Sequence, residues 1–270
     1  MKRGLFFILL VVVLAGVGAA WAGGPGDVLP WGRPAAKNEE MPLPMGVGLT
    51  FYWQSQDYSL DRWQASSPIP EVNAMIAQLS AGVDALSIEN ETIEENVKFD
   101  VWLLPFLNVF ALLGNIDGQT DIKMMPPLPK IEVDYNGIVY GGGAVLAGGW
   151  KEYFASLTGI YTGTELDEQD STINAWVLQP RVGAQLKGPG EKNNVILWLG
   201  AMYQQVTEEH KGSINITGLG PVDYNVRLKD DTPWNYLAGV ALCVGRNVEI
   251  SLEGGFGDRQ NVELTGTYRF

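Results

Sequence analysis

The sequence contains a single cysteine, Cys243, and a single histidine, His210, among its 270 residues. One cysteine excludes both an intramolecular disulfide and a metal site built on cysteine thiolates. His210 lies in the charged stretch Glu208-Glu-His-Lys211 with no marked serine nearby, so a His-dependent hydrolase site is not indicated. The acidic stretch at 165–170 lacks the spacing of a calcium loop. The sequence therefore predicts no enzyme, no metal site and no cofactor.

Positive charge is also scarce. The chain has 18 Lys and Arg residues against 31 Asp and Glu residues, for a formal net charge of −13 at pH 7. Neutralising nucleic-acid phosphates requires clusters of lysine and arginine, and none stands out here. We therefore expect no nucleic acid among the partners.

Long apolar runs are missing beyond the first residues. The nearest candidate, 101–113, contains Pro105 and Asn108 and is shorter than the roughly 18 residues that a spanning helix needs. This excludes a helical membrane protein after the N-terminal segment. That segment has basic Lys2 and Arg3, an apolar stretch at 5–14 and a small-residue pattern at 20–22, the arrangement of a signal peptide. Cleavage is expected after residue 22, with an uncleaved anchor as the alternative, and the Gly/Pro-rich 23–44 reads as an extended leader.

What the chain does have is alternation of apolar and polar residues. In the final stretch, Val262, Leu264, Tyr268 and Phe270 occupy even positions and polar residues occupy the odd ones. Alternate side chains of a strand point to opposite faces, so this pattern predicts a strand with one apolar face. The same pattern recurs in about ten segments, with eight or twelve as alternatives. They lie at 45–53, 97–103, 110–116, 131–148, 153–165, 176–186, 195–203, 234–244, 248–256 and 261–270.

Two stretches between these segments break the alternation. Residues 57–96 contain a helical spacing of apolar residues, which predicts a short loop helix at 70–86. That helix could cover one end of the domain, plug a lumen or lie in a membrane surface. Residues 208–233 form the second long polar insertion. Both insertions are expected to be outward-facing loops.

Three features favour a membrane barrel over a soluble sandwich. Short and long connections alternate along the chain, as they do between the two ends of an outer-membrane barrel. Aromatic residues gather near the strand ends, the distribution of two interfacial girdles. Charges occupy the faces opposite the apolar residues and would point into a lumen, where opposite charges are expected to pair. The predicted lumen charge network comprises Lys98, Asp100, Arg181, Glu249, Glu253, Glu263 and Arg269.

The signal peptide, the alternating strands and the ending Leu264-Thr-Gly-Thr-Tyr-Arg-Phe270 resemble a small Gram-negative outer-membrane β-barrel protein. The resemblance implies an all-β, antiparallel, up-and-down transmembrane barrel over 45–270, located in the bacterial outer membrane. It also implies that Gly266, Tyr268 and Phe270 belong to a terminal signal read by the barrel-assembly machinery. The expected partners are that machinery and outer-membrane lipid. The Gly-to-aromatic spacing is one residue tighter than the usual pattern of that class.

Three functions remain open for such a barrel. The first is a structural or surface-interaction role without a catalytic site. The second is a narrow channel or transport barrel for small or apolar solutes, and the third is a lipid-modifying enzyme. The extracellular or small-solute ligand is not identified by the residues.

Overall fold

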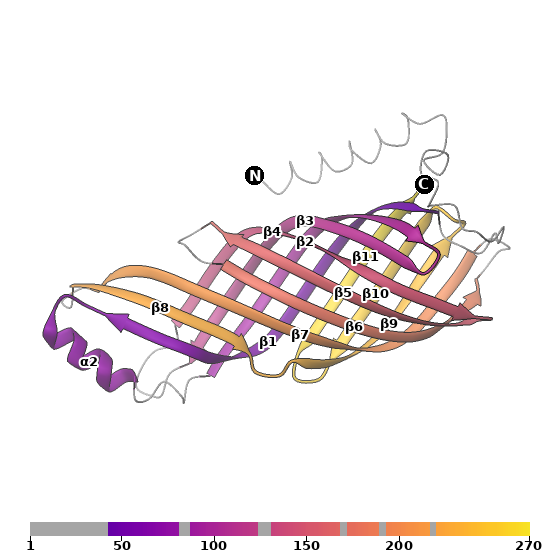
Figure 1. Cartoon of the computed structure of the whole chain (residues 1–270). Coiled ribbons are helices and arrows are strands. Elements are labelled where there is room, and N and C mark those ends of the chain that lie inside the picture. Colours follow the sequence, from indigo (N-terminus) through magenta and orange to yellow (C-terminus); the bar gives the residue numbers. More distant parts are fainter. Residues whose placement is uncertain (1–42, 81–86, 124–130, 168–171, 189–192, 217–219) are drawn as a thin grey trace.

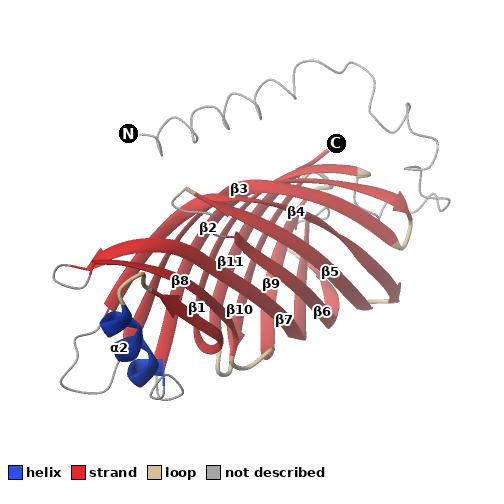
Figure 2. Ribbon diagram, turned by 60° about the vertical axis from the view of Figure 1, so that its left-hand side comes forward, coloured by secondary structure: helices blue, strands red, loops and turns tan. Residues whose placement is uncertain are grey.

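The computed structural model describes residues 43–80, 87–123, 131–167, 172–188, 193–216 and 220–270. The predicted signal peptide and nearly all of the predicted leader lie outside these residues. Strands make up almost the whole of the described chain, and one short helix joins them (Figure 2). Among the described residues, no helix combines the length and the apolarity that crossing a bilayer would require.

Eleven strands form one antiparallel sheet, and ten of them close into a barrel (Figure 1). The strands are β1 (Met45–Ser66), β2 (Ser87–Leu104), β3 (Leu107–Lys123), β4 (Ile131–Trp150), β5 (Tyr153–Leu166), β6 (Thr172–Lys187), β7 (Asn193–Ile216), β8 (Gly220–Asp230), β9 (Trp234–Val244), β10 (Val248–Phe256) and β11 (Gln260–Arg269). Neighbours around the ring follow chain order except that β7 pairs with β9. The predicted all-β barrel of about ten strands is confirmed.

The last strand closes the ring against the first. β11 pairs antiparallel with β1 from Gly46 opposite Arg269 to Ser55 opposite Gln260. At the chain end, Met45 and Phe270 exchange two backbone hydrogen bonds, of 3.2 and 3.0 Å. Because every strand in the ring has two neighbours, no strand edge remains open to lipid at this level.

The remaining strand, β8, is not part of the ten-strand ring and lies beyond one end of it. It pairs on one side with β7, from Thr207 to Ile216, and on the other with β1, from Tyr58 to Ser66. At this level β8 takes the place of the three shorter strands β9, β10 and β11, so the ring of ten strands narrows to a ring of eight, β1 to β8. The long strands β1, β7 and β8 then project beyond the barrel (Figure 1).

The position of β8 corrects two predictions. Residues 57–96 and 208–233 are not simply loops, because they contain the ends of β1, β2 and β7 together with all of β8. The alternation of apolar and polar residues comes from lipid on one face of a strand. Strand segments beyond the bilayer have no lipid to face, so they lack the pattern that marks the others.

The predicted helix is present but shorter. The helix α2 runs over Pro70–Ser80, and 81–86 lie outside the described residues. It sits at the tip of the projection, where it contacts β1, and not in the lumen (Figure 1). Asn73 holds its start, because the side-chain carbonyl accepts from the Ser67 amide (2.8 Å) and the side-chain amide donates to the Ser67 carbonyl (2.6 Å).

Candidate functional site

The lumen of the barrel encloses a cavity of ≈ 490 Å³. It extends from Arg269 near the short-turn end to Tyr58 at the level of β8. The seven residues of the predicted charge network, Lys98, Asp100, Arg181, Glu249, Glu253, Glu263 and Arg269, all line it. All seven side chains therefore lie on the lumen side of their strands.

Five of the seven charges form ion pairs with one another. Arg181 on β6 reaches Glu253 on β10 through two hydrogen bonds, Nε to Oε2 at 2.7 Å and Nη2 to Oε1 at 2.8 Å. Near the short-turn end, Arg269 Nη1 donates to Asp100 Oδ1 at 2.8 Å and its Nε lies 3.7 Å from Glu249. At two levels, these contacts join strands that are not direct neighbours in the wall, β6 to β10 and β11 to β2.

The remaining two charges are arranged differently. Lys98 Nζ lies 5.6 Å from the centroid of the Phe110 ring, a cation–π distance. Glu263 accepts a 3.3 Å hydrogen bond from Thr265. Neither has an ion pair among the described residues. Which lumen charges pair depends on the curvature of the barrel wall. The alternation of residues along one strand carries no information about that curvature.

The wall of the cavity is divided into two arcs of different polarity. β1, β2, β10 and β11 contribute a polar arc that includes Tyr52, Glu94 and Glu263. These three lie side by side because Tyr52 is opposite both carboxylates in the strand register. Sequence reasoning missed Tyr52 and Glu94, although both lie on the same alternating face as the residues it selected. The opposite wall, from β3 to β7, is mainly apolar; its members include Phe110, Ile116, Val139, Phe154, Ile160, Ile173, Val177, Ile196 and Val206.

A second buried cluster lies where the ring narrows from ten strands to eight. Arg259, in the turn between β10 and β11, is only 1% exposed. Its Nε donates to Gln56 Oε1 at 2.6 Å, and its Nη2 donates to the Thr232 carbonyl at 3.2 Å and lies 3.5 Å from Asp230 Oδ2. Asp230 Oδ2 also accepts from the Val206 amide at 2.8 Å.

This cluster ties the end of β8 to β1, to β7 and to the last hairpin of the chain. Burial raises the pKa of the Asp230 carboxyl to about 6, and the nearby positive charge of Arg259 acts in the opposite direction. The sequence signal for the cluster was only a charged turn, Gly257-Asp-Arg259. Nothing in that turn reveals that the arginine is buried.

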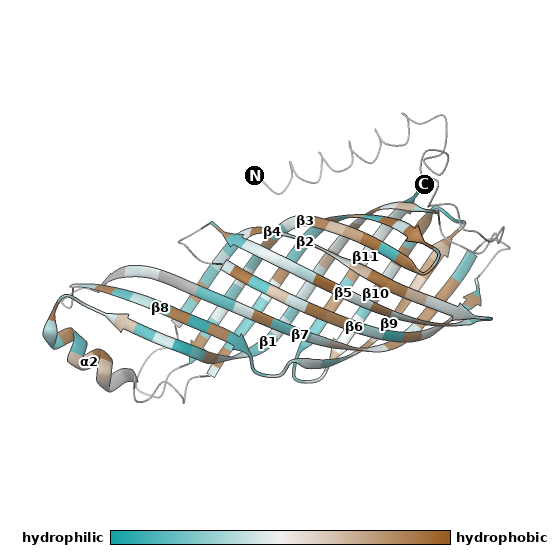
Figure 3. Cartoon of the chain, viewed as in Figure 1, coloured by the Kyte–Doolittle hydropathy of each residue, from teal (hydrophilic) through white to brown (hydrophobic). Residues whose placement is uncertain are grey.

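The outer face of the barrel is apolar. Large side chains such as Val182 (63% exposed), Leu199 (64%) and Ile250 (49%) point outward from the strands. Apolar bands run along the barrel strands, and hydrophilic residues are more frequent on the projecting ends of β1 and β8 (Figure 3). A continuous apolar outer face on a closed sheet is the surface that a strand-built protein presents to hydrocarbon.

Aromatic residues border this apolar face at both ends. At the end with the longer connections, Tyr203 packs edge-on against Trp234 (5.2 Å between centroids), and Tyr236 stacks with Phe256 (6.0 Å). At the short-turn end, Trp150 and Tyr153 are 72% and 57% exposed. Such pairs of girdles mark the two interfaces of a bilayer. The chain is an outer-membrane-type β-barrel.

No family model matches the sequence of the barrel, and no curated protein resembles it in sequence. Its fold is similar to several solved outer-membrane structures. The β domain of the Bordetella autotransporter BrkA is 14% identical, with 84% of this chain and 100% of that chain covered and a TM-score of 0.40. OprG from Pseudomonas aeruginosa is 11% identical (86% and 99% covered, TM-score 0.39), and the toluene transporter TodX from Pseudomonas putida is 10% identical (92% and 93% covered, TM-score 0.31). At this level the likeness concerns the fold only.

Two residues of the predicted assembly signal, Gly266 and Tyr268, lie on the closing strand of the barrel, and Phe270 directly follows it. Gly266 is opposite Leu49 of β1, and the ring of Tyr268, 43% exposed, stacks with that of Phe270 at 6.3 Å between centroids. Recognition by the assembly machinery remains a prediction. His210 lies in β7 opposite Val226. Within the described parts of the chain, no group of three or more His, Cys, Asp or Glu residues is arranged to hold a metal ion.

Proposed function

We propose that the barrel binds small amphipathic solutes in its lumen and conducts them across the bacterial outer membrane. The observation that carries this proposal is that the ≈ 490 Å³ cavity has a polar arc on one side and an apolar arc on the other. Ligand sites are typically cavities of about 300–1,000 Å³ whose walls are mostly apolar with a few placed polar groups. A solute with an apolar body and a small polar head matches the two arcs.

The lumen also distinguishes this role from a purely structural one. A structural barrel of this size is expected to fill its interior with its own side chains. Here the interior retains a cavity that passes both levels of ion pairs. The structural or surface-interaction role predicts that solute movement is the same with and without the protein.

Uptake of radiolabelled benzyl alcohol into outer-membrane vesicles tests the proposal. The vesicles come from a lipopolysaccharide-bearing host with and without the barrel, since the lipopolysaccharide leaflet slows apolar solutes. We expect faster benzyl alcohol uptake with the barrel and little change in glucose uptake. Equal benzyl alcohol rates in the two kinds of vesicle would contradict the proposal.

Two matched variants identify the surface involved. Val177→Asp places a charge on the apolar arc, and Ser251→Asp places the same charge on the polar arc. A charge on an apolar wall costs desolvation free energy for any apolar ligand, so Val177→Asp should slow uptake several-fold while Ser251→Asp leaves it nearly unchanged. Both variants must show heat-dependent gel mobility, the mark of a folded barrel. Equal losses in the two would mean that the apolar arc is not the binding surface.

A further inference from the structure

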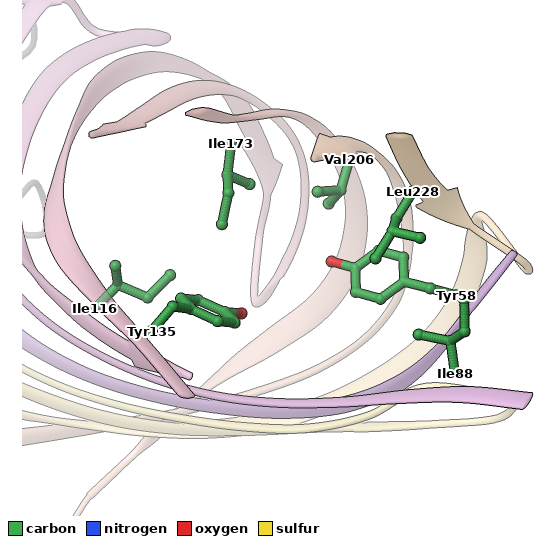
Figure 4. Close-up of a cluster of buried hydrophobic side chains, with 7 residues drawn as sticks. All are labelled: Tyr58, Ile88, Ile116, Tyr135, Ile173, Val206 and Leu228. Atoms are coloured by element: carbon green, nitrogen blue, oxygen red, sulfur yellow. The ribbon is translucent and has the colours of Figure 1, made fainter. Parts of the chain in front are cut away.

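Mainly apolar side chains surround much of the lumen at the level where β8 enters the wall. Tyr58, Ile88, Ile116, Tyr135, Ile173, Val206 and Leu228 form one buried cluster, each at most 9% exposed. We call these seven residues the apolar ring. They come from seven strands, β1, β2, β3, β4, β6, β7 and β8, and they all point inward (Figure 4). Five of them, all but Ile88 and Leu228, line the cavity.

The apolar ring lies at the level where the fewest strands form the wall. Barrel diameter grows roughly linearly with strand number, and an eight-strand barrel is only wide enough for side chains to fill. Toward the short turns, ten strands surround the lumen. At the level of the apolar ring, eight strands surround it. Side chains from opposite walls can therefore approach one another here more closely than they can toward the short turns.

Tyr135 is held in place within the ring by neighbours on two other strands. Its hydroxyl accepts a 2.8 Å hydrogen bond from Asn90 Nδ2 and lies 3.1 Å from Thr92 Oγ1. Its aromatic ring covers Gly118 of β3, where an added Cβ would come within 2.2 Å of Tyr135 Cζ. Only glycine at 118 allows the tyrosine to lie in this position, so the narrow part of the lumen has a defined shape.

We infer that the apolar ring is a selectivity filter that admits the apolar body of a solute and bars hydrated ions. This inference rests on the proposed function, and it assigns the choice of solute to one level of the cavity wall, the level where β8 enters. Apolar constrictions exclude ions because water leaves them, so an ion would have to shed its hydration shell to pass. An apolar body gains from the same surroundings, since its transfer out of water is favourable.

Planar-bilayer recordings and the vesicle uptake assay together test the filter. Val206→Thr and Ile173→Thr introduce hydroxyl groups into the apolar ring, and the Val206 change leaves side-chain shape nearly the same. Val139→Thr makes the same change on the apolar wall outside the ring. We expect a low ion current for the wild-type barrel, a several-fold rise for the ring variants, and no rise for Val139→Thr. Benzyl alcohol uptake should fall in the ring variants.

Gly118→Ala provides an independent variant, because it leaves every ring residue unchanged and displaces only Tyr135. It should raise the ion current, provided that heat-dependent gel mobility shows a folded barrel. Ion currents that stay at the wild-type level in all of the folded ring variants would overturn the filter. If uptake by the wild type persists in that case, the proposed function stands and only the filter is lost. If the wild-type barrel does not accelerate benzyl alcohol uptake, the proposed function itself fails.

Discussion

Arg181 and Glu253 form a bidentate ion pair inside the lumen. The two hydrogen bonds measure 2.7 and 2.8 Å, and Glu253 is 3% exposed. The indole nitrogen of Trp198 donates to the same carboxylate. The two partners lie on β6 and β10, with β7 and β9 between them in the wall. The contact therefore braces the barrel across its interior.

Arg181→Leu should destabilise the barrel, because it leaves the Glu253 carboxylate buried without its cation. Removing one partner of a buried ion pair typically costs about 3–5 kcal/mol. The double variant Arg181→Leu/Glu253→Leu should recover much of the loss, since no uncompensated charge remains. Guanidinium unfolding of the detergent-folded protein, followed by tryptophan fluorescence, measures both effects. Lys98→Leu is the control, as Lys98 lines the same lumen without an ion pair among the described residues. Equal costs for the single and double variants would contradict the bracing role.

Arg259→Met should loosen β8 while leaving the ten-strand ring closed. The substitution keeps most of the side-chain length but removes the contacts to Gln56, to the Thr232 carbonyl and to Asp230. Amide hydrogen exchange in β8 should become faster, and exchange in β4 and β5 should change little. Arg246→Met, in the exposed turn between β9 and β10, is the matched control. Uniform acceleration across all strands would show that Arg259 supports the whole barrel and not β8 in particular.

Protection of β8 should also depend on pH through Asp230. Its pKa in the folded protein, about 6, is above the ordinary value of 3.8. The folded state therefore binds a proton that the open state does not, so protection is greatest at low pH and is lost as pH rises toward and through 6. Between pH 5 and 7 the change should be roughly tenfold, after correction for intrinsic exchange rates. Arg259 and Glu208 are the charged groups that also act on this carboxyl.

Asp230→Asn should remove this pH dependence, and Asp223→Asn should not. Asp223 lies on the same strand but is exposed. If the Asn variant at 230 keeps the wild-type slope, the pH dependence comes from another group.

Deleting Phe270 should impair insertion into the outer membrane more than a change in any loop. The deletion removes the backbone hydrogen bonds to Met45 and the ring that stacks on Tyr268. The heat-modifiable fraction in purified membranes measures insertion, and Phe270→Tyr, which keeps the strand and an aromatic ring, should insert nearly as well as wild type. A membrane yield that is unchanged by the deletion would refute the role of the terminal aromatic.

Most of the surface that faces lipid could be predicted from the sequence, and the part of the structure beyond the lipid could not. In β3 the alternation was misleading, because its apolar residues Phe110 and Ile116 face the lumen. Alternation placed Leu264 outward and Glu263 inward, because a strand between hydrocarbon and a polar lumen must separate the two kinds of side chain. Together with the positions of the aromatic residues, the same reasoning favoured a membrane barrel. It treated the stretch containing β8 as a loop. A strand outside the bilayer does not need apolar residues on one face and polar residues on the other, so β8 lacks the alternation.

The partners of the ion pairs and the burial of single side chains also could not be predicted from one sequence. Glu253 was assigned to the lumen, but its partner on β6 depends on the curvature of the wall. Arg259 looked like an ordinary turn residue, and its burial results from the narrowing of the ring above it. The apolar ring shares no sequence motif, since its seven members come from seven strands.

The position of Arg259 has a consequence for the order in which the protein folds. This arginine belongs to the turn that joins the last two strands of the chain, yet it contacts Asp230 at the end of β8. The surface that receives the end of β8 is therefore complete only after the final hairpin has formed. The projecting end of the barrel is built from β1, β7 and β8, but its last connection must wait for the chain's end.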